Sequence, residues 1–397
     1  MPLTLNTGCH TVTGCLNSVT AAPDLRAVTL SANSSWYLYN FRASTIRRLI
    51  GDGYRVICLS PLDDYSARLP ELGCEWLPLP MDNATTNPLK DLLLLGRLWS
   101  HYQRLKPVAA LHFTVKNNVY GTWAARALGV PAINNVSGLG TAFIRTGLVA
   151  AVVRLLYKTS QPLSAQVFCQ NAEDQQLLVD NRLVPHARLT LLPGSGVDLQ
   201  RFNPYLRQSH TGPGPFRFLY AGRMLADKGL HELIDAMRQL HAQGHEAVLW
   251  LCGFADVSNV SAITIAQLQA WGEEPYIEWL GPTDAMEQVL SQVDCVVLPS
   301  YREGLPRSLL EAGAMGLPVI ATDVPGCRHV VEHGVNGLLC EPKDSGSLRN
   351  SMLQMLSLTE EQRADMGAKG RAKVEAHFSE QVVVDATMAA IKRHARS

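Results

Sequence analysis

The chain has 397 residues, of which 47% are hydrophobic and 18% charged, and its 35 Lys and Arg balance 35 Asp and Glu. This length predicts two domains of roughly 180 residues each. The zero net charge argues against nucleic acid or a strongly anionic surface as the main partner. Nine scattered cysteines without a Cys-x-x-Cys pair indicate buried thiols in a reducing cytoplasm. No apolar run reaches the roughly 18 residues that span a bilayer, and we expect no signal peptide.

Residues 1–25 lack periodicity, and we expect them to form a loose N-terminal extension. From Arg26 onward, apolar strand patterns alternate with helical patterns, which predicts a parallel sheet covered on both faces. The expected strands are 26–32, 54–60, 107–113 and 131–136, and the expected helices are 40–52, 89–104 and 120–128.

A stretch rich in Pro, Gly and Ser, "GVDLQRFNPYLRQSHTGPGP", predicts a linker. Beyond it, "FRFLY", "AVLWLC", "YIEWL", "CVVLP" and "PVIA" predict five further strands separated by helices. The fold class is therefore α/β, with two doubly wound sheets and a crevice between their strand C-terminal ends. The expected domains are 26–205 and 206–375, and 376–397 is expected to be a helix that crosses back to the first domain.

The segment "LPSYREGLPRSLLEA" predicts a loop that leads directly into a helix. Pro306 suits the first turn of that helix, and the free N–H groups around Arg307 and Ser308 suit a phosphate. Glu303 lies in the loop and Glu311 lies eight residues later inside the helix. At such different depths they do not form an acid/base pair, and each carboxylate suits two vicinal hydroxyls of a sugar or a ribose.

A basic pair, Arg223 and Lys228, lies in "YAGRMLADKGLHEL", between a predicted strand and a predicted helix. A planar guanidinium and a compact ammonium suit two linked phosphates and stabilise a departing diphosphate without a metal. Taken singly, Lys228 and Glu311 also suit a solvated helix surface, and glycines such as Gly222 and Gly304 also suit turns. Their combination favours a binding site.

Four motifs in this order, "GRMLADKG", "LPSYREGLPRSLLEA", "GLPVIATDVPG" and "GVNGLL", resemble the donor half of the family 4 retaining glycosyltransferases. The resemblance extends from about Arg26 to the end of the chain and implies the GT-B fold, in which two Rossmann-like domains face a central cleft. It implies that Glu303 binds the donor sugar, Glu311 the ribose, and Arg223 and Lys228 the diphosphate. The implied main-chain contacts to the donor come from Gly222, Gly304, Leu305, Ser308, and, near the base, Gly253, Phe254 and Gly281.

The first domain is expected to bind the acceptor. Its loop "SANSSWYLYNFR" has Asn and Ser where members of the resembled family often have two glycines. The aromatic residues Trp36 and Tyr39 suit a sugar acceptor, although each also suits the core. Arg42 suits an acceptor phosphate or a helix cap.

Two further stretches, "LHFTVKNNVYG" and "VSGLGTAF", resemble transferases that build bacterial surface polysaccharides. Many family members carry a histidine at the end of the strand corresponding to 131–136, but this chain has Val136 and Ser137, so that role is not transferred. His112 is a candidate substitute, and a structural role for it is the other interpretation. Lys116 suits an acceptor diphosphate, and Ser137 completes the candidate acceptor-binding residues.

The resemblance implies transfer of a hexose or N-acetylhexosamine from a nucleotide sugar, with UDP expected, to an undecaprenyl-diphosphate-linked saccharide in O-antigen, capsule or glycan assembly. It implies same-face attack without a covalent intermediate, a metal or a cofactor; Asp63 and Asp64 are interpreted as a solvated turn. The alternatives are a nucleotide-sugar epimerase and a catalytically silent nucleotide-sugar-binding partner.

The segment 143–163 is apolar with interspersed Arg145, Arg154 and Lys158. It suits a basic amphipathic helix at the cytoplasmic face of the inner membrane, where a lipid-linked acceptor is reached. A buried helix with basic ends is the equal alternative.

Overall fold

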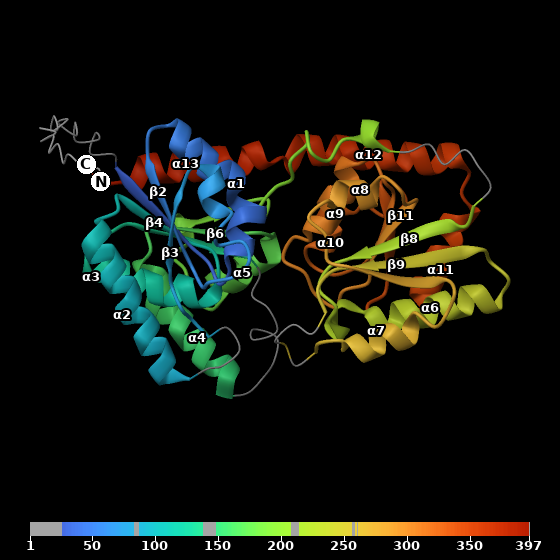
Figure 1. Ribbon diagram of the computed structural model, residues 1–397, viewed down its shortest axis with the longest axis horizontal. Coiled ribbons are helices and arrows are strands. Elements are labelled where there is room, and N and C mark those ends of the chain that lie inside the picture. Colours follow the sequence, from blue (N-terminus) through green and yellow to red (C-terminus); the bar gives the residue numbers. More distant parts are fainter. Residues whose placement is uncertain are drawn as a thin grey trace, which may run out of the picture.

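The computed structural model describes residues 26–82, 87–137, 148–207, 214–255, 259 and 261–396, with the backbone alone for 148–150. Two parallel sheets, each flanked by helices, form two domains (Figure 1). The predicted extension 1–25 lies outside the described residues.

The N-terminal domain contains a seven-stranded sheet in the order β3-β2-β1-β4-β5-β6-β7. Its strands are β1 (Ala27–Ser31), β2 (Arg55–Ser60), β3 (Glu75–Pro78), β4 (Ala109–His112), β5 (Ala132–Val136), β6 (Gln166–Cys169) and β7 (Leu189–Leu191). Its helices are α1 (Ser35–Gly51), α2 (Pro88–Leu105), α3 (Thr122–Ala127), α4 (Leu148–Ser160) and α5 (Ala172–Asp180), and a π-helical turn, Asn117–Gly121, precedes α3.

The C-terminal domain contains a six-stranded sheet in the order β10-β9-β8-β11-β12-β13. Its strands are β8 (Phe216–Ala221), β9 (Ala247–Cys252), β10 (Ile277–Gly281), β11 (Cys295–Leu298), β12 (Val319–Thr322) and β13 (Gly337–Cys340). Its helices are α6 (Leu230–Ala242), α7 (Ile265–Trp271), α8 (Met286–Leu290), α9 (Arg307–Ala314), α10 (Cys327–Val330), α11 (Ser345–Ser357) and α12 (Glu360–His377).

Helices on both faces of each sheet explain the apolar sequence of the central strands. Every residue of β1, β4, β5, β6, β11 and β12 is buried. Strands covered on both faces carry apolar runs, which is why β1, β4, β5, β11 and β12 were recognisable in the sequence. The seven cysteines in the described part are free and buried, as their apolar contexts predicted.

Several predicted elements differ from the structure. The expected helix 40–52 begins five residues earlier, at Ser35, because its N-terminus has two caps. The Ser34 side chain accepts a hydrogen bond from the Tyr37 N–H, and Asp63 Oδ2 accepts from the Ser35 N–H at 2.7 Å. Asp63, interpreted as part of a solvated turn, is therefore a cap supplied from another loop. Strands β3, β6, β7 and β13 were not predicted.

Helix α13 (Glu380–His394) runs from the second domain back along the first (Figure 1). The chain crosses between the domains at two adjacent places, where Val197 N–H donates to Phe378 O and Glu380 N–H donates to Val197 O. Val383, Met388 and Ile391 of α13 are buried in the core of the N-terminal domain. The last helix is thus part of the first domain's packing.

This packing predicts different costs for two truncations within α13. Ile391→Ala removes a fully buried side chain and should lower the free energy of unfolding by about 2–4 kcal/mol. Val382→Ala, at an exposed position of the same helix, should change it by roughly 0.5 kcal/mol or less. Equilibrium denaturation of both variants measures the difference, and equal small effects would show that α13 is not docked in solution.

Candidate functional site

Three glycines line the carboxyl ends of neighbouring strands in the second sheet. Gly222 N–H donates to Cys252 O at 2.9 Å, and Gly253 N–H donates to Gly281 O at 3.0 Å. Gly253 has φ +147°, and a Cβ there would overlap Gly222 O. This edge of the sheet therefore presents backbone to a ligand at the positions from which base recognition was expected.

Lys228 and Glu303 are in direct contact. Lys228 Nζ lies 2.5 Å from Glu303 Oε1, which also accepts from Ser300 Oγ at 2.7 Å. Arg223 is exposed, and the described residues provide no ion pair for its side chain. The structure thus brings Lys228 and Glu303 together across the strand ends of β8 and β11, with Arg223 on the same loop as Lys228.

Helix α9 begins after Pro306, as predicted, and carries Ser308 in its first turn. Glu311 Oε1 accepts from Arg307 Nε at 2.7 Å, and Arg307 also donates to Asn40 O of the N-terminal domain at 2.6 Å. Burial raises the pKa of Glu311, and the Arg307 guanidinium opposes that shift. Sequence reasoning did not assign this role to Arg307; its i, i+4 spacing from Glu311 was the available signal.

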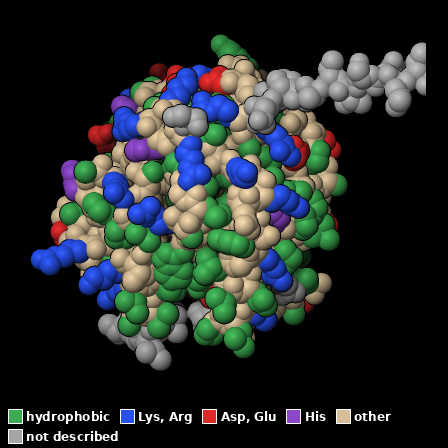
Figure 2. Space-filling model, turned by 90° about the vertical axis from the view of Figure 1, so that its left-hand side faces the viewer, with side chains coloured by type: hydrophobic (Ala, Val, Ile, Leu, Met, Phe, Trp, Pro, Cys, Tyr) green, Lys and Arg blue, Asp and Glu red, His purple; other side chains and the backbone are tan. Residues whose placement is uncertain are grey.

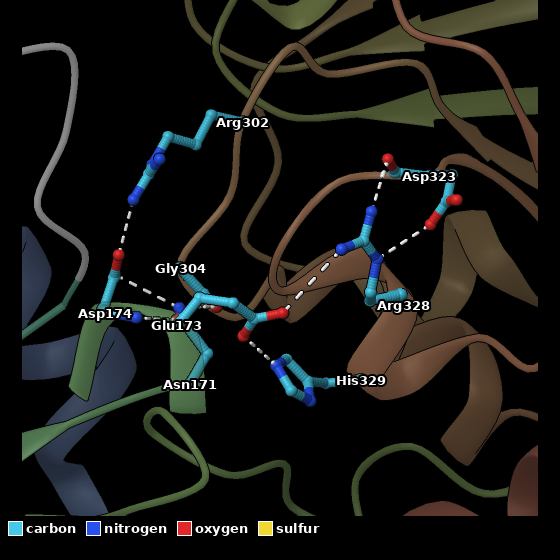
Figure 3. A network of polar contacts seen from close by, with 8 residues as sticks. All are labelled: Asn171, Glu173, Asp174, Arg302, Gly304, Asp323, Arg328 and His329. Atoms are coloured by element: carbon cyan, nitrogen blue, oxygen red, sulfur yellow. Dashed lines mark hydrogen bonds and ion pairs between the residues drawn. The ribbon is translucent and has the colours of Figure 1, made fainter. Parts of the chain in front are cut away.

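The loop that carries Glu303 is held by the other domain (Figure 3). Arg302 Nη2 donates to Asp174 Oδ1 at 2.5 Å, and the Asn171 side chain donates to Gly304 O at 2.9 Å. Asp174 is only 1% exposed, and its backbone N–H donates to Asn171 Oδ1. Asn171 and Asp174 open helix α5, so the helix cap of one domain also binds the site loop of the other.

A second cluster lies beside the first in Figure 3. Glu173 Oε2 is 2.6 Å from His329 Nε2, and Arg328 Nε donates to Asp323 Oδ1 at 2.8 Å. The sequence analysis did not identify the pairs Arg302–Asp174 and His329–Glu173, which join the two domains. Their members lie 128 or more positions apart, so they leave no local pattern in the sequence.

The two predicted half-sites come close together at Gly304. A Cβ at Gly304 would overlap Ser137 O, at the end of β5. The adjacent Leu305 side chain packs beside Gly194, where the chain leaves the first domain. The carboxyl ends of both sheets therefore meet at this loop, as the predicted crevice requires.

On the first-domain side lies a cavity of about 280 Å³. Its lining residues are Asn33, Thr114, Val115, Lys116, Asn118, Ser137 and Tyr157. Lys116 Nζ lies 2.7 Å from Asp91 Oδ1, and Tyr120 donates to Asp91 Oδ2 at 2.9 Å. Two of the candidate acceptor-binding residues, Lys116 and Ser137, are thus brought together.

His112 is a correction to the sequence analysis. It is fully buried, its Nε2 lies 2.8 Å from the Tyr102 hydroxyl, and its Nδ1 lies 2.7 Å from Asn134 Oδ1. Burial lowers the pKa of His112 to about 4, although Asn134 opposes the shift. Both ring nitrogens are used inside the core, so the structural interpretation of His112 holds and its proposed contact with the acceptor does not.

Of the other candidate acceptor-binding residues, Arg42, Trp36 and Tyr39 do not line this cavity. Arg42 is 1% exposed and lies 4.3 Å from the Phe113 ring, so it cannot reach a ligand here. The Trp36 ring packs edge-on against the Phe254 ring of the second domain, with 5.9 Å between the ring centroids. The Tyr39 ring stacks under Arg68, which pairs with Asp284 of the second domain. The two aromatic residues therefore serve the contact between domains.

Two facing parallel-sheet domains, with the loop of Arg223 and Lys228 and the carboxylates of Glu303 and Glu311 near their junction, have the arrangement of the GT-B fold. Residues 204–373 match the family described as glycosyl transferases group 1. This part of the chain is a glycosyl transferases group 1 domain, and the protein is a glycosyltransferase.

Relatives and structures agree with this assignment. The chain is 26% identical over 364 residues to N,N'-diacetylbacillosaminyl-diphospho-undecaprenol alpha-1,3-N-acetylgalactosaminyltransferase of Campylobacter jejuni, covering 87% of this chain and 93% of that protein. It is 25% identical to the capsular polysaccharide biosynthesis glycosyltransferase CapM of Staphylococcus aureus, covering 77% and 81%. Anabaena Alr3699/HepE, solved with UDP and glucose, superposes with a TM-score of 0.73 at 19% identity, covering 91% of this chain and 98% of that chain.

The buried His112 predicts an acid-sensitive fold. The unfolded chain binds a proton at this histidine below its ordinary pKa of 6.5, whereas the folded chain binds it only near pH 4. Stability should therefore fall as the pH drops from about 6.5 to about 4, by a contribution of about 3 kcal/mol from this residue. Denaturation at several pH values measures this dependence. The free energy of unfolding should fall less steeply with decreasing pH in His112→Gln than in the wild type, and as steeply as in the wild type in the exposed control His186→Gln.

The contact of Arg302 with Asp174 predicts a measurable coupling between the domains. In a double-mutant cycle of Asp174→Asn and Arg302→Gln, the coupling free energy of unfolding should be about 1–3 kcal/mol, since Asp174 is buried. The matched cycle at the exposed pair Asp365 and Lys369 should give about 0.5 kcal/mol or less. A coupling at Asp174 no larger than this control would contradict closure of the domains in the unliganded protein.

Proposed function

We propose that the protein is a retaining glycosyltransferase that moves a hexose or N-acetylhexosamine from a UDP-sugar to a lipid-diphosphate-linked saccharide. The observation that carries the proposal is the meeting of two half-sites at Gly304. Lys228, Glu303 and the start of α9 lie on one side, and the cavity with Lys116 and Ser137 lies on the other.

The donor side supports a nucleoside diphosphate sugar. The backbone edge of Gly222, Gly253 and Gly281 suits a flat base, and Glu311 at the interior of the site suits ribose hydroxyls. The similar Anabaena protein was solved in complex with UDP and glucose. This similarity in fold supports UDP as the first nucleotide to test.

Charges of the site lie in ion pairs, and these pairs suggest how the donor engages it. Lys228 pairs with Glu303 at 2.5 Å. A diphosphate next to Lys228 competes for that ammonium, and Glu303 then accepts from sugar hydroxyls. Arg223, Lys228 and the N–H groups of α9 stabilise the departing diphosphate.

Retention follows if the acceptor hydroxyl attacks from the face that the diphosphate leaves, with a phosphate oxygen taking its proton. In this scheme Glu303 binds the sugar and forms no covalent bond to it. In this scheme the charge of the departing diphosphate is balanced by Arg223, Lys228 and the start of α9 without a metal, so full activity in a chelator is expected.

The acceptor side supports an anionic, lipid-linked substrate. The start of α1 is not open to phosphate, because the Asp63 carboxylate already accepts from its N–H groups. Lys116, at the wall of the cavity, is the cation placed to bind an acceptor diphosphate. The Campylobacter relative, by its name, acts on a diphospho-undecaprenol acceptor.

We further propose that the protein works at the cytoplasmic face of the inner membrane and that 143–163 contacts it. No described helix is long and apolar enough to cross a bilayer. Helix α4 exposes Val152 and Leu155, as a helix at a membrane surface would, and buries Tyr157, as a core helix would. The two interpretations of this segment therefore apply to different faces of the helix. Residues 143–147 lie outside the described part.

Transfer is tested by incubating the protein with a UDP-sugar, with and without a lipid-diphosphate-linked saccharide. UDP should be released only with the acceptor, and the product should keep the donor's anomeric configuration. Lys228→Met and Glu303→Gln should each lower kcat/KM by roughly 10²–10³-fold, because the first removes a cation that stabilises the departing diphosphate and the second a carboxylate that accepts from the sugar hydroxyls. The control Lys369→Met changes an exposed lysine of α12 and should have wild-type activity.

Each other outcome contradicts the proposal in a distinct way. Conversion of the UDP-sugar without acceptor would indicate an epimerase. Donor binding without turnover would indicate a silent binding partner. A covalent glycosyl adduct at Glu303 would overturn the same-face mechanism, and loss of activity in a chelator would overturn its independence of metal.

A further inference from the structure

Helix α2 is apolar on two opposite faces. One face packs into the domain core through Leu94, Leu98 and Tyr102. The opposite face points to solvent and carries large apolar side chains at helical spacing, with exposed fractions of 74% for Leu89, 64% for Leu92, 58% for Leu93 and 41% for Trp99. A solvent-facing stripe of this kind is not needed to fold the domain.

Helix α4 extends this apolar surface. Both helices contact the π-helical turn Asn117–Gly121 and pack into the same core cluster, so they cover the same face of the sheet. Val152 and Leu155 of α4 are exposed, and so is Leu163 shortly after it. Figure 2, which views this end of the molecule, shows apolar side chains gathered on its lower part with Lys and Arg around them.

The charge of this part of the chain is strongly one-sided. Between Asp82 and Glu173 the sequence has a single carboxylate, Asp91, which is buried and paired with Lys116. The same segment has nine cationic residues: Lys90, Arg97, Arg104, Lys106, Lys116, Arg126, Arg145, Arg154 and Lys158. The chain as a whole has no net charge, so this segment carries an excess of positive charge that the rest of the chain balances, although Lys90 also pairs with Asp82 at 2.6 Å.

We propose that the exposed faces of α2 and α4 dock on an anionic phospholipid bilayer, with Leu89, Leu92, Leu93 and Trp99 entering the headgroup region. Cations around an apolar stripe complement anionic headgroups above acyl chains. Trp99 at the end of the stripe suits the boundary between water and lipid. Helix α2, which sequence analysis did not connect with a membrane, supplies the main contact, and α4 the second.

The surface is built on the same helices as the cavity. Asp91 of α2 holds Lys116, and Tyr157 of α4 lines the cavity. Docking through these two helices therefore keeps the cavity close to the headgroups, where the diphosphate of a membrane-held acceptor lies. This consequence rests on the proposed function, whereas the docking itself does not.

Docking is measured by co-sedimentation with vesicles of phosphatidylcholine alone and of an equimolar mixture with phosphatidylglycerol. The protein should bind the mixed vesicles, and binding should weaken as salt is raised. Leu92→Ser with Leu93→Ser should weaken binding at least tenfold, because two apolar side chains no longer enter the lipid. Lys90→Gln with Lys158→Gln should reduce the preference for phosphatidylglycerol.

The matched control is Ile265→Ser, an apolar residue of the second domain with exposure similar to that of Trp99. It should bind as wild type, and thermal unfolding should be unchanged in every variant because all these positions are exposed. Brominated lipid should quench part of the tryptophan fluorescence, and that part should be absent in Trp99→Phe.

Transfer to a short-chain, water-soluble acceptor separates this inference from the proposed function. The Leu92 and Leu93 variant should keep that activity while losing activity on vesicle-held acceptor. Equal binding of this variant and wild type to mixed vesicles would overturn the docking surface, and so would a dimer of the wild type that these substitutions dissociate. Vesicle binding without any transfer would leave the surface supported and overturn the proposed function.

Discussion

The close contact at Gly304 is the constraint on which the site depends. The loop after β11 passes between Ser137 O of the first domain and the turn at Gly326 of the second, where a side chain on Gly304 would overlap its neighbours. Glu303 directly precedes Gly304. The Asn171 side chain donates to Gly304 O, and Arg302 donates to Asp174, so the first domain holds the residues on both sides of Glu303. The position of the Glu303 carboxylate is therefore set by both domains together.

Three ion pairs at the candidate site join cations to carboxylates. Lys228 pairs with Glu303, Arg307 with Glu311, and Lys116 with Asp91, all at 2.5–2.7 Å and largely shielded from water. An unpaired charge at such depth would cost several kcal/mol, so each partner of these pairs stabilises the other.

The charge of the chain is distributed unevenly along the sequence. The net charge is zero, but carboxylates are almost absent from the segment that forms α2 to α4 and are concentrated elsewhere. A sum over the chain cannot detect such separation, because attraction to a surface depends on the local field. Likewise, the apolar stripe of α2 contributed to its prediction as a helix, and only the structure shows which of its two faces is covered.

The sequence by itself determined the two parallel-sheet domains, the helix start at Pro306, the loop with Arg223 and Lys228, and the returning C-terminal helix. These depend on apolar runs, on proline and glycine, and on motifs that are local in the chain. The tertiary structure decided what distant residues do: Asp63 caps α1, Asn171 and Asp174 hold the loop at Gly304, and His112 lies in the core rather than beside the acceptor. The physical reason is that burial and hydrogen-bond partnership depend on distance in space, so a polar residue at a strand end has the same local pattern whether it faces a cavity or the core.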